Sequence, residues 1–394
     1  MSHLHHVYSS LIRRQTVRAF SRSLGTHRGD SIDYSTRLFS SQPSNQKIES
    51  KDHHLLPRLY VGPTPTLETI RIRAGESKAF SPSESETSNI PRLSTNSQIT
   101  LSTDQSHYLT AVLRTFRKSK RKRNVQSLVR LFDGLSGEWL AQIRLMGTTT
   151  EDVGSRNRRS AATAEPVVAE CLEQLRPQSK QREISVRPAA WLCIAPPKKK
   201  ERIRWLLEKA TELGVDRIVW LKSDYSEPPQ ISSLEKLHSY LVEAAEQSER
   251  LSIPRFVQII PPSEQETDAP SLPLFEGTDV DNFATQLPDL LDYAASDQSF
   301  KLLVCRERSK SHPLWQAFQD HFESSSALAF VVGPEGGWSP AELQRMDPGS
   351  TDFSSSSICN ISLGPTVLRS ETAVSAALAG YALFKDYVME QSTE

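Results

Sequence analysis

Two glycine-containing loops carry the residue types in this chain that could do chemistry. The first, GPEGG at 333–337, follows the apolar run 329–332. It leads into SPAE at 339–342, a capping-box pattern with proline at the first helical position. Glycines let the backbone approach a ligand closely, and the free N–H groups of a helix N-terminus suit a nucleotide-like ligand. A tight turn before a helix explains the same residues, which match neither a Walker loop nor GxGxxG.

The second loop, ISLGPTVLR at 361–369, runs into a helix whose expected cap is Ser370. Arg369 and Glu371 stand beside this helix N-terminus. An arginine there can bind phosphate, and a glutamate can accept a proton. A surface salt bridge between the two side chains is the alternative interpretation.

Alternating strands and helices must position these two loops. Helices are expected at 201–213, which ends at Gly214, at 234–249 and from Ser370 onward. Strands are expected at 190–194, 217–221, 302–304 and 329–332. This alternation predicts a mostly parallel sheet covered by helices on both faces. The acidic stretch 261–298 has weak periodicity and is expected to be a loop insertion.

The first half of the chain has a different pattern. A hairpin is expected from 129–134 and 138–143, because alternating strands flank a turn. Further strands at 57–61 and 167–171 and a short helix at 107–114 complete a small β-barrel. The stretches 63–97 and 147–164 are polar and are expected to be loop insertions.

The two loops closely resemble the signature segments of the bacterial 16S ribosomal RNA uridine-N3 methyltransferase family (RsmE), within the SPOUT superfamily. The resemblance is carried by GPEGG and by LGPTVLRSETA at 363–373. Three more matches occur in the same order: PRLY at 57–60, HYLTAVLR with LFDG at 107–134, and KATELGV with AAEQSER at 209–250. The resemblance covers about Pro57 to Tyr387 apart from the three insertions.

This resemblance implies an α/β fold with two domains. A PUA-like β-barrel RNA-binding domain is expected at 55–180, and a SPOUT methyltransferase domain with a deep C-terminal trefoil knot at 185–390. It also implies a homodimer in which two subunits complete the active site, and S-adenosyl-L-methionine as cofactor. The implied cofactor-binding residues are Val332, Gly333, Glu335, Gly336 and Gly337 in the first loop, and Ile361, Leu363, Gly364 and Leu368 in the second.

The implied reaction is methylation of N3 of a uridine in small-subunit ribosomal RNA, free or in an assembling subunit. Uridine N3 carries a weakly acidic proton, so a base should help. Glu371 is the candidate base, and Arg369 is the candidate for orienting the RNA or neutralising its charge. The reaction needs no metal.

Two other functions fit parts of the sequence. A SPOUT ribose 2′-O-methyltransferase would share the knot and the cofactor, but it typically carries serine-leucine-asparagine where this chain has LRSET at 368–372. A non-catalytic ribosome-assembly factor would keep the fold for RNA binding alone. Binding of S-adenosyl-L-methionine distinguishes either methyltransferase from the non-catalytic assembly factor.

A dense run of basic residues is the candidate RNA-binding surface. It comprises Arg114, Arg117, Lys118, Lys120, Arg121, Lys122 and Arg123. Lys198, followed by Lys199 and Lys200, could add a second contact surface. Phosphate contacts of this kind give salt-sensitive affinity without sequence readout. The family usually has a short turn at this run, so a solvated loop or a nuclear localisation signal remain alternatives.

Residues 1–45 have the composition of an organellar transit peptide, because arginines and serines are frequent and no acid precedes Asp30. The mitochondrial matrix is the expected destination, with the chloroplast stroma as the alternative. Net charge is zero, so affinity for RNA must come from local patches. No apolar run approaches the length of a membrane span. The four cysteines, Cys171, Cys193, Cys305 and Cys359, lack metal-binding spacing and are expected to be reduced thiols.

Overall fold

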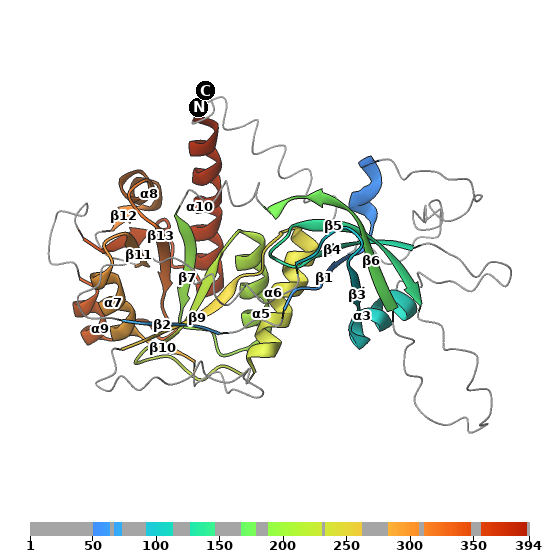
Figure 1. Cartoon of the computed structure of the whole chain (residues 1–394). Helices are drawn as coiled ribbons and strands as arrows, with labels where there is room; N and C mark the ends of the chain where they lie inside the picture. The colour runs from blue at the N-terminus through green and yellow to red at the C-terminus, as the bar shows by residue number, and fades with distance from the viewer. Residues whose placement is uncertain are drawn as a thin grey trace, which may run out of the picture. The chain divides into compact units, whose positions relative to one another are not determined.

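A computed structural model of the chain describes ten ranges (Figure 1). They are residues 50–63, 67–72, 92–112, 127–145, 167–178, 188–230, 233–261, 283–306, 311–347 and 356–391. The expected transit peptide, the insertion at 147–164 and the basic run from Arg114 to Arg123 lie outside these ranges. Residues 54–394 form one compact unit. In the described part of the chain, no helix is both long and apolar enough to cross a membrane.

The first sheet has five strands in the order β1-β4-β5-β6-β3. Their bounds are β1 Arg58–Tyr60, β3 Gln98–Thr100, β4 Ser127–Phe132, β5 Glu138–Leu145 and β6 Val167–Arg176. The expected hairpin is confirmed, since β4 pairs antiparallel with β5 and Leu131 lies opposite Trp139. Three short helical segments accompany the sheet: η2 Ser50–Leu55, α3 Thr103–His107 and η3 Tyr108–Val112. Leu109 and Leu131 are fully buried in its core.

The second sheet has nine strands, and every pair in it is parallel. The order is β12-β14-β11-β13-β7-β8-β9-β2, with β10 paired to β8. The bounds are β2 Glu68–Arg71, β7 Ala189–Ile194, β8 Arg217–Lys222, β9 Arg255–Ile260, β10 Thr285–Gln286, β11 Phe300–Cys305, β12 His312–Pro313, β13 Ala327–Val332 and β14 Ile358–Ser362. The prediction of a mostly parallel sheet is therefore confirmed.

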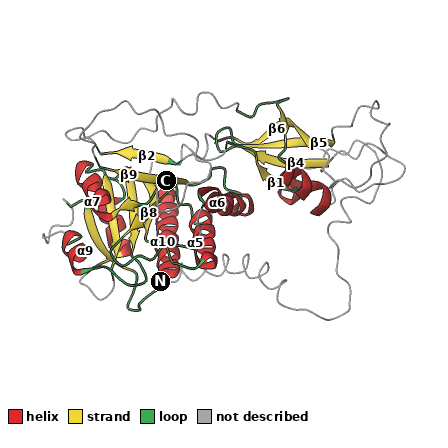
Figure 2. Ribbon diagram, turned by 90° about the horizontal axis from the view of Figure 1, so that it is seen from below, coloured by secondary structure: helices red, strands yellow, loops and turns green. Residues whose placement is uncertain are grey.

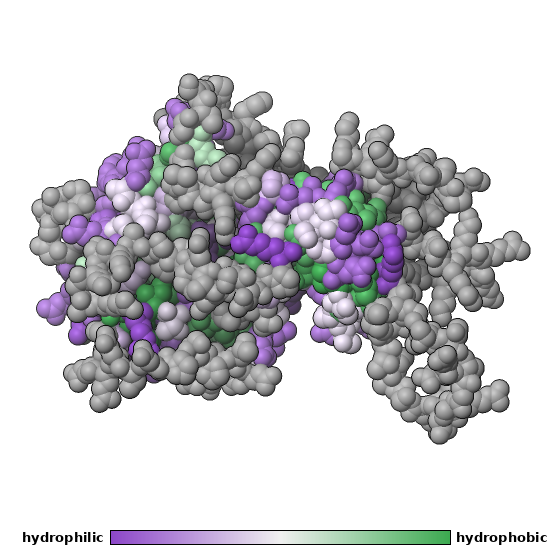
Figure 3. Space-filling view, in the orientation of Figure 1, coloured by the Kyte–Doolittle hydropathy of each residue, from purple (hydrophilic) through white to green (hydrophobic). Residues whose placement is uncertain are grey.

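Helices cover both faces of this sheet (Figure 2). They are α5 Lys200–Glu212, α6 Leu234–Ser248, α7 Leu287–Ser296, α8 Leu314–His321, α9 Pro340–Arg345 and α10 Ser370–Gln391. Side chains of α5, α6, α8 and α10 form one core with the sheet, and α7 and α9 contribute to the core on the other face. Strands β11 and β13 are therefore buried on both sides, as expected from the unbroken apolar sequence of β13 and the apolar sequence of β11 after Lys301. On the face drawn in Figure 3, hydrophobic residues form small patches among hydrophilic ones.

Two expected loop insertions contain regular structure. Residues 68–71, inside the expected insertion 63–97, form β2 and pair in parallel with β9 at the edge of the second sheet. Residues 285–296, inside the expected insertion 261–298, form β10 and α7, which buries Leu290 and Ala294. The prediction was wrong at both places, because such short elements gain their stability from a neighbouring strand or core rather than from local periodicity.

Candidate active site

The two glycine-containing loops lie at the same edge of the parallel sheet. The first follows the carboxyl end of β13 and the second follows the carboxyl end of β14, and both strands flank β11. The segments after β7 and β8 leave the sheet at this edge too, since these strands are parallel to β13. Ligands of open α/β sheets bind outside the carboxyl ends of the strands. This edge is therefore the candidate active site.

Hydrogen bonds fix the first loop at both of its ends. The Gly337 N–H donates to the Pro334 carbonyl at 2.9 Å, which closes a tight turn. The expected capping box is present: the Glu342 N–H donates to Ser339 Oγ at 3.2 Å, and the Ser339 N–H donates to Glu342 Oε2 at 2.8 Å. The other Glu342 oxygen accepts from the Asp224 N–H at 2.9 Å. The loop is thereby tied to the segment that follows β8.

The glycines of this loop stand where a side chain would collide with a neighbour. A Cβ atom on Gly333 would lie 2.6 Å from the Trp338 ring. A Cβ atom on Gly336 would lie 3.1 Å from Cβ of Tyr225. Gly337 needs its conformational freedom for another reason, because its φ is +77°. The backbone at Gly333 and Gly336 therefore packs closely against Trp338 and Tyr225, and the shape of this loop depends on glycine at both positions.

The second loop is anchored at its ends and exposed between them. Ile361 is buried, and Leu363 and Leu368 pack partly buried against the helix-covered core. Gly364 has a φ of +122°, which only glycine adopts readily. Arg369 is exposed, and none of the residues that the structure describes forms an ion pair with it. Its guanidinium is therefore available to a ligand.

Arg202, on the first turn of α5, joins the two loops. It donates from Nε to Glu371 Oε1 at 3.0 Å and from Nη2 to Glu371 Oε2, a two-bond pairing. Its Nη1 also donates to Glu335 of the first loop. The alternative of a salt bridge between Arg369 and Glu371 is wrong, because Glu371 pairs with Arg202 instead. Sequence reasoning missed Arg202, since its pairing depends on α5 meeting α10.

The pKa of Glu371 reflects this pairing. Partial burial raises the pKa, but the hydrogen bonds and charge of Arg202 outweigh burial, and the net shift is downward. Glu371 is thus a carboxylate at neutral pH and a weaker base than an unpaired glutamate.

The remaining predicted residues fall into two groups. The nine predicted cofactor residues all lie in or next to the two loops, and the structure brings these loops to one edge. Lys198 lies just before α5, and its Nζ lies 2.6 Å from Glu227 Oε2. This ion pair partly neutralises the positive charge of Lys198. The other predicted RNA-binding residues lie outside the described ranges. In those ranges, no cluster of three or more potential metal ligands occurs.

The four cysteines are unpaired thiols. Burial raises the pKa of Cys305 to about 12 and, with nearby charges, the pKa values of Cys171 and Cys359 to about 11. Burial also raises the pKa of Cys193. Protonated thiols are poor nucleophiles, so the cysteines contribute packing rather than chemistry.

Comparison with known proteins gives concordant matches. Residues 186–269 and 279–381 match the RNA methyltransferase domain family. Ribosomal RNA small subunit methyltransferase E of Rickettsia conorii is 26% identical over 300 residues, covering 76% of this chain and 95% of that protein. The Synechocystis protein of the same name is 27% identical over 282 residues, covering 71% of each chain. A solved structure of the Neisseria gonorrhoeae protein of that name contains S-adenosyl methionine. It aligns with this chain at a TM-score of 0.51 and 19% identity, and the alignment covers 84% of this chain and 98% of that protein.

The parallel sheet, the loops at its carboxyl edge and the family match define residues 186–381 as an RNA methyltransferase domain. The alignments with the curated relatives are longer than this domain and extend over most of the chain. Over most of its length, the chain is similar to proteins named ribosomal RNA small subunit methyltransferase E.

Proposed function

We propose that this chain is an S-adenosylmethionine-dependent methyltransferase that modifies N3 of a uridine in small-subunit ribosomal RNA. The observation that carries the proposal is the joining of the two loops by Arg202 at the carboxyl edge of the sheet. The names of the curated relatives support ribosomal RNA as the substrate.

The two loops suit the cofactor in shape and in charge. Gly333 and Gly336 let the loop pack closely against Trp338 and Tyr225, which fixes the shape of the backbone that would meet the cofactor. Arg202 with Glu335 and Glu371 carries one positive and two negative charges, so the group has a formal charge of minus one. S-adenosylmethionine supplies an electrophilic methyl group on a positively charged sulfonium when bound. A net negative charge nearby stabilises such a cation.

The protein's own side chains would act on the RNA. Glu371, held as a carboxylate, is the candidate acceptor of the N3 proton, directly or through water. The exposed Arg369 is the candidate for neutralising negative charge on the RNA. The expected cap at Ser370 is wrong, because Ser370 is already the first residue of α10 and its hydroxyl donates to Glu371. Arg369 directly precedes the helix and Glu371 is its second residue, so both side chains project from the start of α10.

The same proposal includes the finer architecture implied by the resemblance. The C-terminal part would thread a trefoil knot, supported by the insertion of β14 between β12 and β11. The five-stranded sheet would be a PUA-like RNA-binding barrel. A homodimer is supported by exposed apolar side chains on α8 and α10, among them Trp315, Leu383 and Tyr387. The transit-peptide composition of residues 1–45 supports an organelle, with the mitochondrial matrix preferred.

The decisive experiment maps N3-methyluridine by mass spectrometry in mitochondrial small-subunit ribosomal RNA from cells with and without this protein. We expect one modified uridine to disappear and to return with the wild-type protein. Gly336→Asp should not restore it, because the new side chain collides with Tyr225. Persistence of every such uridine in mitochondria and plastids would contradict the proposed target and compartment. Failure to bind S-adenosylmethionine would favour an assembly factor.

Gly333→Ala should weaken S-adenosylmethionine binding about tenfold, a loss of about 1.4 kcal/mol. The new Cβ forces the Trp338 ring to move, and the loop moves with it. Isothermal titration calorimetry measures the affinity. Gly214→Ala is the matched control, because Gly214 has a φ of +91° but no atom within 4 Å of an added Cβ. It should cost about 1 kcal/mol of stability and leave the affinity unchanged. Equal affinities for both variants would argue against this loop as a cofactor site.

A further inference from the structure

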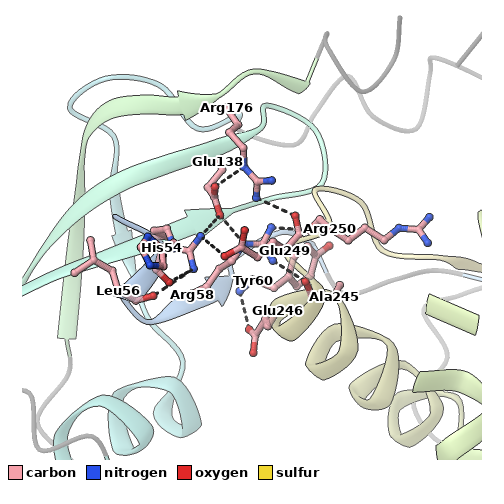
Figure 4. A network of polar contacts seen from close by, with 11 residues as sticks. His54, Leu56, Arg58, Tyr60, Glu138, Arg176, Ala245, Glu246, Glu249 and Arg250 are labelled. Atoms are coloured by element: carbon pink, nitrogen blue, oxygen red, sulfur yellow. Dashed lines mark hydrogen bonds and ion pairs between the residues drawn. The ribbon is translucent and has the colours of Figure 1, made fainter. Parts of the chain in front are cut away.

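Three segments that match the family have no role in the site described above. They are PRLY at 57–60, LFDG at 131–134 and AAEQSER at 244–250. The structure brings all three to one place, where the five-stranded sheet meets the C-terminal end of α6 (Figure 4). They lie far apart in the sequence, so only the fold explains why they occur together.

Arg58 is the centre of this junction. Its Nη1 donates to the Ala245 carbonyl at 2.7 Å and its Nη2 to the Arg250 carbonyl at 2.6 Å. Its Nε donates to Glu138 Oε1 at 2.5 Å. The guanidinium also lies 3.7 Å from the centre of the Phe132 ring. One side chain of the first sheet thus binds backbone carbonyls at the C-terminal end of α6, where the helix dipole favours a cation.

Other charges of the first sheet converge on the same helix end. Arg176 donates from Nε to Glu138 Oε2 at 2.6 Å and from Nη2 to the Glu249 carbonyl at 2.9 Å. Arg130 pairs with the Glu249 carboxylate at 3.0 Å. Burial raises the pKa of Glu138, but hydrogen bonds from Arg176 and Arg58 outweigh it and the pKa lies below its usual value. Glu138 is therefore a buried carboxylate, with its side chain only 2% exposed.

The helix end that receives these contacts is linked to the candidate active site. Arg250, just after α6, donates to the Thr211 carbonyl of α5 at 3.1 Å and to Asp216 at 3.2 Å. Helix α6 packs against α5, and α5 carries Arg202. A continuous path of contacts therefore leads from Arg58 to the arginine that joins the two loops.

Buried ion pairs contribute little net stability, because desolvating the charges costs about as much as their attraction returns, but they can specify one geometry. We propose that Arg58 and Glu138 form a positioning device that fixes the five-stranded sheet relative to the loops, so that RNA held by this sheet presents its uridine to the site. The inference rests on the proposed function. Arg58 acts as a positioning residue, since it touches neither loop.

The test is Arg58→Lys in the full-length protein. Lysine keeps the charge, but one ammonium group cannot reproduce the planar fork that reaches Glu138, Ala245 and Arg250 together. With undermethylated small subunits as substrate, we expect kcat to fall about tenfold or more, because misplaced groups react slowly even when bound. The S-adenosylmethionine affinity and stoichiometry, and the RNA dissociation constant, should stay within about twofold of wild type.

A second variant tests whether misfolding, rather than the lost pairing, could explain a lower kcat in Arg58→Lys. Arg58→Met with Glu138→Leu replaces the buried pair by apolar groups, an exchange that many proteins tolerate. It should show the same loss of kcat. Arg204→Met is the matched control, because Arg204 pairs with Glu208 and Glu243 on an exposed surface. Its kcat should be unchanged.

Spin labels on Glu173→Cys in β6 and Glu235→Cys in α6 measure the distance across the junction without a catalytic assay. We expect a narrow distance distribution in the otherwise wild-type protein and a broad one with Arg58→Lys. A wild-type kcat in both junction variants would overturn the proposal, and so would a loss of kcat matched by an equal loss of cofactor stoichiometry. If the wild-type protein methylated no RNA, the proposed function would fail, while the spin-label distances would still decide whether Arg58 fixes the junction.

Discussion

Replacing Glu371 with glutamine is expected to lower kcat by about 10²- to 10⁴-fold, the usual range for loss of a general base. Glutamine keeps the shape of the side chain and can still accept one hydrogen bond from Arg202, but it cannot accept a proton. Because Arg202 holds the pKa of Glu371 below its ordinary value, the carboxylate is present at every pH above about 6. The loss should therefore be the same from about pH 6 to about pH 7.5, a range in which N3 of uridine keeps its proton.

Single-turnover methylation of small subunits, measured at several pH values with saturating cofactor, gives this comparison directly. Full turnover of Glu371→Gln at every pH would show that the base assignment is wrong. Equilibrium binding of S-adenosylmethionine separates the two possible roles of Glu371. An affinity close to wild type with slow turnover indicates a base, and an equal loss of both indicates that Glu371 mainly anchors Arg202.

Replacing Arg202 with methionine is expected to lower kcat/KM by about 10²-fold, because both loops lose their shared partner and small misplacements cost that much. The variant should also acquire a pH dependence that the wild type lacks. Without the guanidinium, the pKa of Glu371 should rise relative to the wild type, because burial is then opposed only by the weaker hydrogen bonds from Ser370 and the backbone. A protonated Glu371 cannot act as base, so the rate should fall as the pH is lowered toward that raised pKa.

The Arg204→Met enzyme again serves as control, since Arg204 lies two positions further along α5 and its ion pairs are exposed. It should match wild type within about twofold, as exposed pairs contribute little. The Arg202→Met, Glu371→Gln double variant completes a mutant cycle. If the two residues act as one unit, the double variant should be no slower than the slower single variant. Additive losses would contradict a shared role.

The two loops could be found from sequence because their signals are local. Gly333 to Gly337 after an apolar strand, and Ser339 with Glu342 as a capping box, depend on residues within one turn of chain. The second loop is similar, since Gly364 and the start of α10 at Ser370 stand close together in the sequence. The parallel sheet was predictable for the same reason, because unbroken apolar strands alternate with helices of clear periodicity.

Short elements that depend on distant partners could not be found in this way. The strand Glu68–Arg71 forms only because β9 offers it an edge, and α7 forms over a core built by other strands. The strand is only four residues long and mostly polar, so nothing local distinguishes it from a loop. Helix α7 does carry Leu287, Leu290 and Ala294 at helical spacing, a short local signal within a mostly polar stretch.

By itself, the sequence determined the alternation of the main strands and helices, the two loops and the residues in them that could meet a cofactor or RNA. Only the tertiary structure decided which charges meet. Arg202 reaches Glu371 because α5 packs against α10, across 169 positions of sequence. Arg58 reaches the end of α6 across 187 positions. An ion pair depends on distances of a few ångströms, and for residues so far apart those distances are set by the packing of the whole chain.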